Sequence, residues 1–173
     1  MCESACASQL VNFPFLGLQG DVDDILAQKC RGIVDVNVGV PYHKILYAWR
    51  IKRNDFRGAA SIVSERLQRL QQSGSGDDIL REDQGGDEFE TPVTQQYLML
   101  INTLSCVTPS QAWILSNPLP GKSSVGGFGS TKGKRKIVTL EDTRKAYQEE
   151  LDRIAAIEND QFTFAVDDEM DMS

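Results

Sequence analysis

The single histidine and the four cysteines are the residues whose side chains are best suited to acid–base, nucleophilic or metal chemistry. His43 stands beside Tyr42 at the start of an apolar helical stripe, a position typical of a surface or partly buried histidine. The cysteines show neither zinc-ligand spacing nor an activating local pattern; they are Cys2, Cys6, Cys30 and Cys106. We therefore predict no catalytic residues, no metal site and no cofactor, and we do not expect an enzyme.

A stretch rich in glycine and lysine, residues 129–134, invites comparison with a phosphate-binding loop. Such a loop needs four residues between its glycines, a Ser or Thr after the lysine and a strand before it. Here three residues separate Gly129 from Gly133, and Arg135 follows Lys134. We interpret this stretch as a flexible loop. The basic run at 132–136 is compatible with a nuclear-import signal or a phosphate contact, but we expect no direct nucleic-acid partner and no small-molecule substrate.

The net charge of −7 is unevenly distributed along the 173 residues. Residues 74–90 hold seven acidic residues and one arginine, and residues 158–173 hold six acidic residues and no base. These two segments therefore carry −12, and the remainder carries +5. The net negative charge of the whole chain is therefore no reason to exclude acidic partners for the remaining residues, which carry +5.

No targeting or membrane-spanning segment is expected from the sequence. The N-terminus has neither a basic region nor an apolar core of the kind found in signal peptides. No apolar run approaches the length needed to cross a bilayer. We expect reduced cysteines and a cytosolic or nuclear setting.

Helical periodicity dominates the chain and predicts an all-α fold of five or six helices, with no credible strands. Two apolar stripes, at 42–52 and 56–70, are joined by a connector so short that they must form an antiparallel hairpin. Start signals predict a helix from Thr91-Pro92 and a short helix carrying Trp113 after Thr108-Pro109. Further helices are expected over 20–33 and from Thr139.

The domain organisation follows from where this periodicity fails. We predict a single α-helical domain or solenoid segment over 1–160, interrupted by an acidic disordered loop at 71–90 and a Gly-, Ser- and base-rich loop at 118–137. Residues 161–173 are expected to form an acidic disordered tail.

Aromatic residues on these helices are the candidate structural and interface positions, since large rings dominate the energetics of cores and interfaces. The candidates are Tyr42, Trp49, Phe56, Trp113 and Tyr147. Tyr47 and Ile51 lie off the main stripe of their helix, so we expect a further element or another protein to cover them.

The hairpin resembles one tetratricopeptide-type helix pair, through Leu46-Tyr47, Asn54-Asp55-Phe56 and Ala59-Ala60. One such pair allows a stand-alone adaptor that binds an acidic peptide in a groove lined by Arg50, Arg53 and Arg57. No 34-residue period supports further repeats.

A longer string, Tyr42-His-Lys-Ile-Leu-Tyr-Ala-Trp-Arg-Ile-Lys-Arg-Asn-Asp-Phe-Arg-Gly-Ala-Ala, resembles the helical region of the large scaffold nucleoporins, the Nup-one-sixty family, called Nup-one-twenty in fungi. Three later segments agree in order, and the resemblance covers roughly residues 40–160. They are Tyr97-Leu-Met-Leu-Ile-Asn-Thr-Leu, Gln111-Ala-Trp-Ile-Leu and Val138-Thr-Leu-Glu-Asp.

This resemblance implies a structural role in the Y-shaped outer-ring complex of the nuclear pore, with other Y-complex nucleoporins as partners. It implies location at the nuclear envelope and support of pore assembly, protein transport and mRNA export. Family members also carry a β-propeller and a longer solenoid, so the chain is similar to a fragment of a longer protein. Helix faces normally covered by neighbours would then be exposed, and self-association is expected.

Overall fold

The computed structural model describes residues 2–32, 40–73, 91–116 and 135–158. Within these ranges the chain is mostly helical, which confirms the predicted fold class. The start of the predicted 71–90 loop is wrong, because residues 71 and 72 are helical. Residues 74–90 of that loop, most of the 118–137 loop and the acidic tail lie outside the described residues. In the described part, none of the helices is long and apolar enough to cross a membrane.

Two helices precede the predicted hairpin. Helix α1 spans Cys2–Asn12 and helix α2 spans Gln19–Gly32. The second was expected from its apolar spacing, and it buries Leu26, Ala27 and Cys30. The tight connection between the two helices places Gly17 at a φ of +79°, a conformation that glycine adopts without strain.

The hairpin forms as predicted from helix α3, Tyr42–Lys52, and helix α4, Phe56–Gln72. Asn54 turns the chain at a φ of +60°, in the left-handed region that asparagine tolerates. The Asp55 side chain then caps α4 by accepting a 2.9 Å hydrogen bond from the Gly58 amide. A Cβ atom on Gly58 would lie 1.9 Å from the Asp55 carboxylate, so this cap requires glycine at that position.

Helix α5, Pro92–Ser105, begins at the predicted signal. Thr91 accepts a hydrogen bond from the Thr94 amide, and the Thr94 hydroxyl accepts one from the Thr91 amide, which completes a capping box. Tyr97 and Leu100 lie on its buried face.

The predicted short helix carrying Trp113 is wrong. Only a 3₁₀ turn, η2 (Pro109–Gln111), forms there, and the Thr108 side chain makes no cap bond. The chain then runs as strand β1, Trp113–Ser116, antiparallel to strand β2, Lys136–Thr139. The end of the predicted 118–137 loop is therefore also wrong, because residues 136 and 137 belong to a strand. The pairing between β1 and β2 satisfies backbone groups that a four-residue helix would have left open.

Helix α6, Leu140–Glu158, begins next to the predicted Thr139. The Asp142 carboxylate accepts hydrogen bonds from the Thr139 amide and hydroxyl, and the Thr139 hydroxyl accepts one from the Asp142 amide. These bonds lower the pKa of Asp142.

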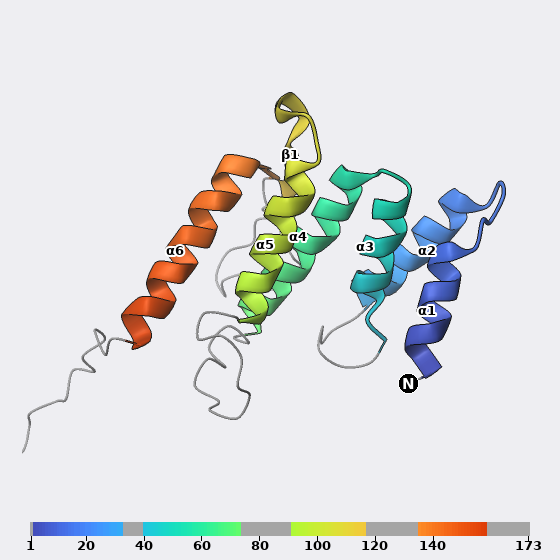
Figure 1. Cartoon of the computed structure of the whole chain (residues 1–173), viewed down its shortest axis with the longest axis horizontal. Helices are drawn as coiled ribbons and strands as arrows, with labels where there is room; N and C mark the ends of the chain where they lie inside the picture. The colour runs from blue at the N-terminus through green and yellow to red at the C-terminus, as the bar shows by residue number, and fades with distance from the viewer. Residues whose placement is uncertain (1, 33–39, 74–90, 117–134, 159–173) are drawn as a thin grey trace, which may run out of the picture.

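Helices α2 to α6 pack side by side in chain order, and α1 packs against α3, at the side of the molecule away from α6 (Figure 1). The α3–α4 turn and the segment from η2 to β1 lie at the same edge of this array (Figure 1). We call this edge, at residues 53–57 and 113, the turn edge.

The buried apolar residues form two clusters, and α4 contributes to both. The N-terminal cluster consists of Leu26, Ala27, Cys30, Ile45, Leu46, Trp49 and Ile62. The C-terminal cluster consists of Ala60, Val63, Leu67, Leu70, Val93, Tyr97, Leu100, Leu104 and Ile114.

Candidate interaction site

Trp49 is the largest fully buried side chain, with 1% of its surface exposed. The periodicity of α3 directs it into the N-terminal cluster, where it meets the Phe15 ring edge-on at a centroid distance of 5.7 Å. The Arg53 guanidinium lies 3.0 Å from the Trp49 ring centroid and donates a 3.2 Å hydrogen bond to the Trp49 carbonyl oxygen. Trp49 is thus enclosed by an aromatic ring and by a cation.

Trp113 lies at the start of β1 and is partly buried. The Arg57 guanidinium lies 4.0 Å from its ring centroid. This contact joins the first turn of α4 to the strand, although the two residues are far apart in sequence. Two arginine–tryptophan stacks therefore occupy the turn edge.

The other three candidate aromatics lie elsewhere. Tyr42 is half-buried and packs against the N-terminal cluster, whereas Tyr147 packs against the C-terminal cluster. The Tyr147 ring is tilted against Tyr97 at a centroid distance of 6.1 Å. Phe56 is half-buried at the first position of α4. The structure therefore distributes the five candidates over the molecule and does not gather them into one site.

Arg50 does not line a groove with the two stacked arginines. Its guanidinium donates hydrogen bonds of 2.9 and 2.6 Å to the two carboxylate oxygens of Asp23, and one of 3.0 Å to the Gly58 carbonyl oxygen. The hydrogen bond to Asp23 raises the pKa of Arg50. This forked pair ties α2 to α3. The predicted three-arginine groove is therefore reduced to Arg53 and Arg57.

Sequence reasoning missed Asp23 as the partner of Arg50. A signal was present, since Asp23 precedes the buried Leu26 and Cys30 by three and seven residues. This spacing places its carboxylate at the buried face of α2, where a charged group needs a partner.

Tyr47 is covered by a further element, as its off-stripe position predicted. Its hydroxyl lies 3.2 Å from the Thr103 hydroxyl on α5, within hydrogen-bond distance. Helix α5 thus reaches α3 at Tyr47. The pairing of these two hydroxyls was not foreseen.

His43 is buried, with 4% of its surface exposed, where α3, α4 and α5 meet. Burial lowers its pKa to about 4, and the positive charges of Arg69 and Arg66 act in the same direction. Among the described residues, Nε2 of His43 and Nε of Arg66 are buried without a hydrogen-bond partner. A histidine held neutral in this way suits packing, and the described residues around it include no Ser, Thr or Cys that it could activate.

Cys30, the buried thiol of the N-terminal cluster, is equally unsuited to catalysis. Burial raises its pKa to about 11, so the reactive thiolate form is scarce at neutral pH. Within the described segments, no group of three or more His, Cys, Asp or Glu side chains is arranged to hold a metal ion.

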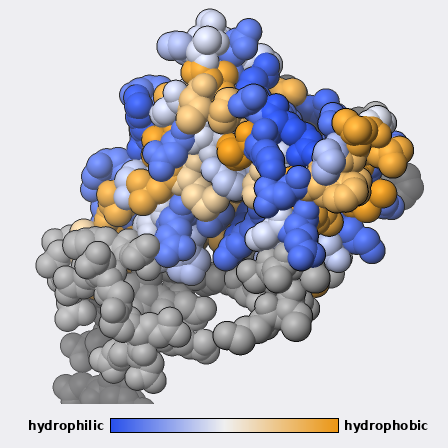
Figure 2. Space-filling model, turned by 45° about the vertical axis from the view of Figure 1, so that its right-hand side comes forward, coloured by the Kyte–Doolittle hydropathy of each residue, from blue (hydrophilic) through white to orange (hydrophobic). Residues whose placement is uncertain are grey.

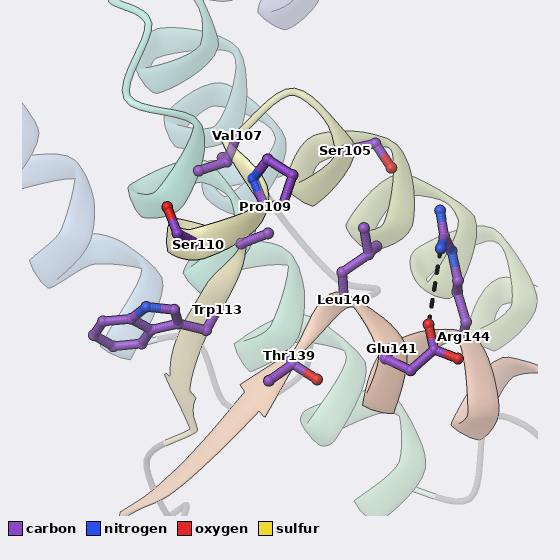
Figure 3. A pocket seen from close by; sticks show the side chains of 10 residues that line it. Ser105, Val107, Pro109, Ser110, Trp113, Thr139, Leu140, Glu141 and Arg144 are labelled. Atoms are coloured by element: carbon purple, nitrogen blue, oxygen red, sulfur yellow. Dashed lines mark ion pairs between the residues drawn. The ribbon is translucent and has the colours of Figure 1, made fainter.

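An open groove of about 540 Å³ lies between η2, β1 and the start of α6 (Figure 3). Its charged groups, Glu141 and Arg144, lie 3.8 Å apart and form an ion pair. Leu140, Val107 and Pro109 supply apolar surface. Figure 3 shows the Trp113 ring directed away from Arg144, so the stack on Arg57 is separate from the polar end of the groove. The groove offers no convergent set of titratable groups for catalysis.

Similarity to known proteins agrees with this architecture. A family model described as the NUP160/120 middle TPR matches residues 1–85, which include α1 to α4. Nucleoporin NUP120 of Chaetomium thermophilum is 38% identical over 98% of this chain and 19% of its own length. Nucleoporin nup120 of Schizosaccharomyces pombe is 31% identical over 62% of this chain and 9% of its own length.

A mammalian relative extends the match beyond fungi. The nuclear pore complex protein Nup160 of Mus musculus is 27% identical over 96% of this chain and 12% of its own length. The chain therefore spans about a fifth or less of the length of these relatives. The helical pairs, the family model and the relatives together show that this chain belongs to the Nup160/Nup120 family.

Proposed function

We propose that this chain is a structural scaffold segment of the nuclear pore outer ring, within the Y-shaped complex. The observation that carries the proposal is similarity to NUP120 over 98% of the chain. The helices described above supply the physical basis, because a row of packed helices keeps its shape through buried contacts and presents its edges to partners.

The proposed partners are other Y-complex nucleoporins, and the proposed location is the nuclear pore at the nuclear envelope. In this role the chain supports pore assembly, protein transport and mRNA export through its shape and contacts, without catalysis and without a cofactor. We propose that Trp49 and Trp113 hold neighbouring elements together, because each ring contacts residues of another segment.

The test is affinity capture with the tagged full chain as bait, from detergent-extracted nuclear envelopes, together with imaging of the tagged chain in cells. We expect recovery of outer-ring nucleoporins and fluorescence at the nuclear rim. A Trp49→Ala variant is the matched control, since it should lose packing and reduce recovery. Diffuse fluorescence together with capture that yields no nucleoporin would overturn the proposal.

The alternative, a stand-alone tetratricopeptide-like adaptor, predicted a groove of three arginines. Arg50 is held by Asp23, which removes one of them. The two remaining arginines favour a contact at the turn edge rather than a peptide laid along a concave groove. An adaptor would bind its partner in the absence of any nucleoporin, so capture from extracts depleted of nuclear envelopes distinguishes the two roles.

A further inference from the structure

Two arginines at the turn edge differ from most other arginines in the described part of the chain. Arg53 follows α3, Arg57 lies in the first turn of α4, and each stacks on a tryptophan. Neither forms an ion pair with a carboxylate of the described residues. Four other arginines do form such pairs: Arg50 with Asp23, Arg69 with Glu65, Arg144 with Glu141 and Arg153 with Glu150.

The acidic residue closest in sequence is already engaged. Asp55 stands between the two arginines, and its carboxylate accepts the hydrogen bond from the Gly58 amide that caps α4. The same carboxylate lies 4.0 Å from Nε of Arg50. Asp55 therefore serves the helix cap and Arg50, and within the described ranges no carboxylate forms an ion pair with Arg53 or Arg57.

Stacking fixes how these charges are presented. A guanidinium lying flat on an indole ring loses little further freedom when it binds. In Arg53, Nη1 already donates to the Trp49 carbonyl oxygen and Nε is buried without a partner, so a two-bond contact is expected at Arg57. That arrangement fits a carboxylate, which accepts two parallel N–H bonds from one guanidinium. Tryptophan and arginine are also the residues most enriched at the energetic centres of protein interfaces.

We propose that the two stacks, Arg53 on Trp49 and Arg57 on Trp113, form a docking site for a carboxylate-rich segment of a partner protein. The site goes beyond the scaffold role proposed above and does not depend on it. Charge complementarity favours an acidic protein over a nucleic acid. A nucleic acid is held by a run of phosphate contacts, whereas the turn edge offers the two stacked arginines, Arg53 and Arg57.

We assign the occupant to a separate chain. The far end of α4, after which the sequence continues into the acidic residues 74–90, lies about 22 Å from Arg57, at 1.5 Å for each residue from 57 to 72. Helix α6, which precedes the acidic residues 159–173 in the sequence, also ends on the side of the molecule opposite the turn edge (Figure 1).

The experiment uses intrinsic fluorescence, because Trp49 and Trp113 are the two tryptophans of the whole chain. The full chain is titrated with a synthetic peptide of repeating Glu-Gly, which contains no aromatic residue. We expect a saturable change in tryptophan emission that weakens as salt is raised. The double variant Arg53→Ala, Arg57→Ala should lose about tenfold or more in affinity, because two charge-assisted contacts are removed.

Two further variants distinguish binding at this site from a general effect of positive charge on the protein surface. Arg135→Ala removes an exposed positive charge before β2 and should leave the affinity unchanged. The double variant Arg53→Lys, Arg57→Lys keeps both charges but loses the planar fork, and should lose most of the affinity. Circular dichroism establishes that each variant is folded, and the lysine variant serves if the alanine variant is not.

Three results would overturn the proposal. The first is wild-type affinity in the alanine variant, and the second is wild-type affinity in the lysine variant, which would reduce the contact to general charge. The third is tighter binding of a single-stranded RNA of similar length through the same two arginines, which would assign the site to nucleic acid.

Discussion

The two hydrophobic clusters are built on different principles. The N-terminal cluster contains one large aromatic residue, Trp49, among smaller side chains such as Ala27 and Cys30. The C-terminal cluster spreads its burial over nine residues, most of them aliphatic, and β1 and α6 close it. The first cluster should therefore depend on a single ring, whereas the second should tolerate loss of any one side chain better.

Large apolar side chains are exposed on both halves of the molecule, and those of the C-terminal half are Leu98, Leu115 and Ile137. Large apolar side chains are exposed around the α1–α2 turn, beside the N-terminal cluster. They are Phe13, Leu16, Leu18 and Ile25, with Leu16 exposed at 86%. Figure 2 shows apolar side chains gathered on the side of the molecule that carries these helices. A region that exposes such residues is one that a neighbour would complete.

Truncation of Trp49 should have the largest effect. Trp49→Ala removes the centre of the N-terminal cluster and should lower the free energy of unfolding by about 3–5 kcal/mol. Leu104→Ala, at a residue with 0% exposure in the C-terminal cluster, should cost less, at the lower end of about 2–5 kcal/mol. Urea unfolding followed by circular dichroism compares them. A larger loss for Leu104→Ala would show that the contrast between the clusters is wrong.

Lowering the pH should test how much the burial of neutral His43, at the boundary between the two clusters, contributes to stability. Because the folded state holds the pKa of His43 at about 4, below its ordinary value of 6.5, the unfolded chain binds the proton first. Stability is therefore complete above about pH 6.5 and falls as pH decreases towards 4. The loss between pH 6.5 and 5 should be about 2 kcal/mol.

The measurement is urea unfolding at a series of pH values, with His43→Gln as the control. That variant should flatten the slope above pH 5, where most carboxylates stay ionised. Since the chain has a single histidine, one NMR titration reads its pKa directly. A value near 6.5 would contradict the burial of this side chain.

Removal of the α5 cap should have an intermediate effect on the C-terminal cluster. Thr91→Ala deletes a buried cap and should cost about 1 kcal/mol. Thr108→Ala is the matched control, because Thr108 makes no cap bond, and it should change the melting temperature very little. Equal shifts for the two variants would mean that the capping box contributes nothing.

The smallest expected effect is at Tyr47, whose hydroxyl meets Thr103 between α3 and α5. Tyr47→Phe should cost about 0.5–1 kcal/mol, at the low end for a hydrogen bond. The Thr103 hydroxyl still has the Met99 carbonyl oxygen at 2.6 Å as a partner. Thermal unfolding by calorimetry measures the difference, and a stabilising effect would show that the contact joins the clusters under strain.

The sequence was most informative where one helix carries both an apolar stripe and a start signal. For α3, α4 and α5 the spacing of buried residues and the cap at Thr91 predicted both the elements and their inward faces. These features are local, so neighbouring residues suffice to specify them.

The sequence failed where the structure depends on a distant partner. Trp113 to Ser116 pair with residues 136–139, which are 20 to 26 positions away in the sequence. Nothing in the four-residue run distinguishes a strand from a helix turn. The three-arginine groove failed for the same reason, since Asp23, on another helix, engages Arg50. The two arginine–tryptophan stacks could not be predicted from the sequence either, because one of them joins α4 to β1, which are far apart along the chain.

Helix α4 has one consequence for how the molecule opens. It gives Ile62 to the N-terminal cluster and Val63, Leu67 and Leu70 to the C-terminal cluster. A helix shared in this way cannot unwind while either side stays packed. Its amide protons should therefore be among the last to exchange with deuterium, whereas those of α1 exchange early. The described part of the chain would then resist loosening at its middle and yield first at α1.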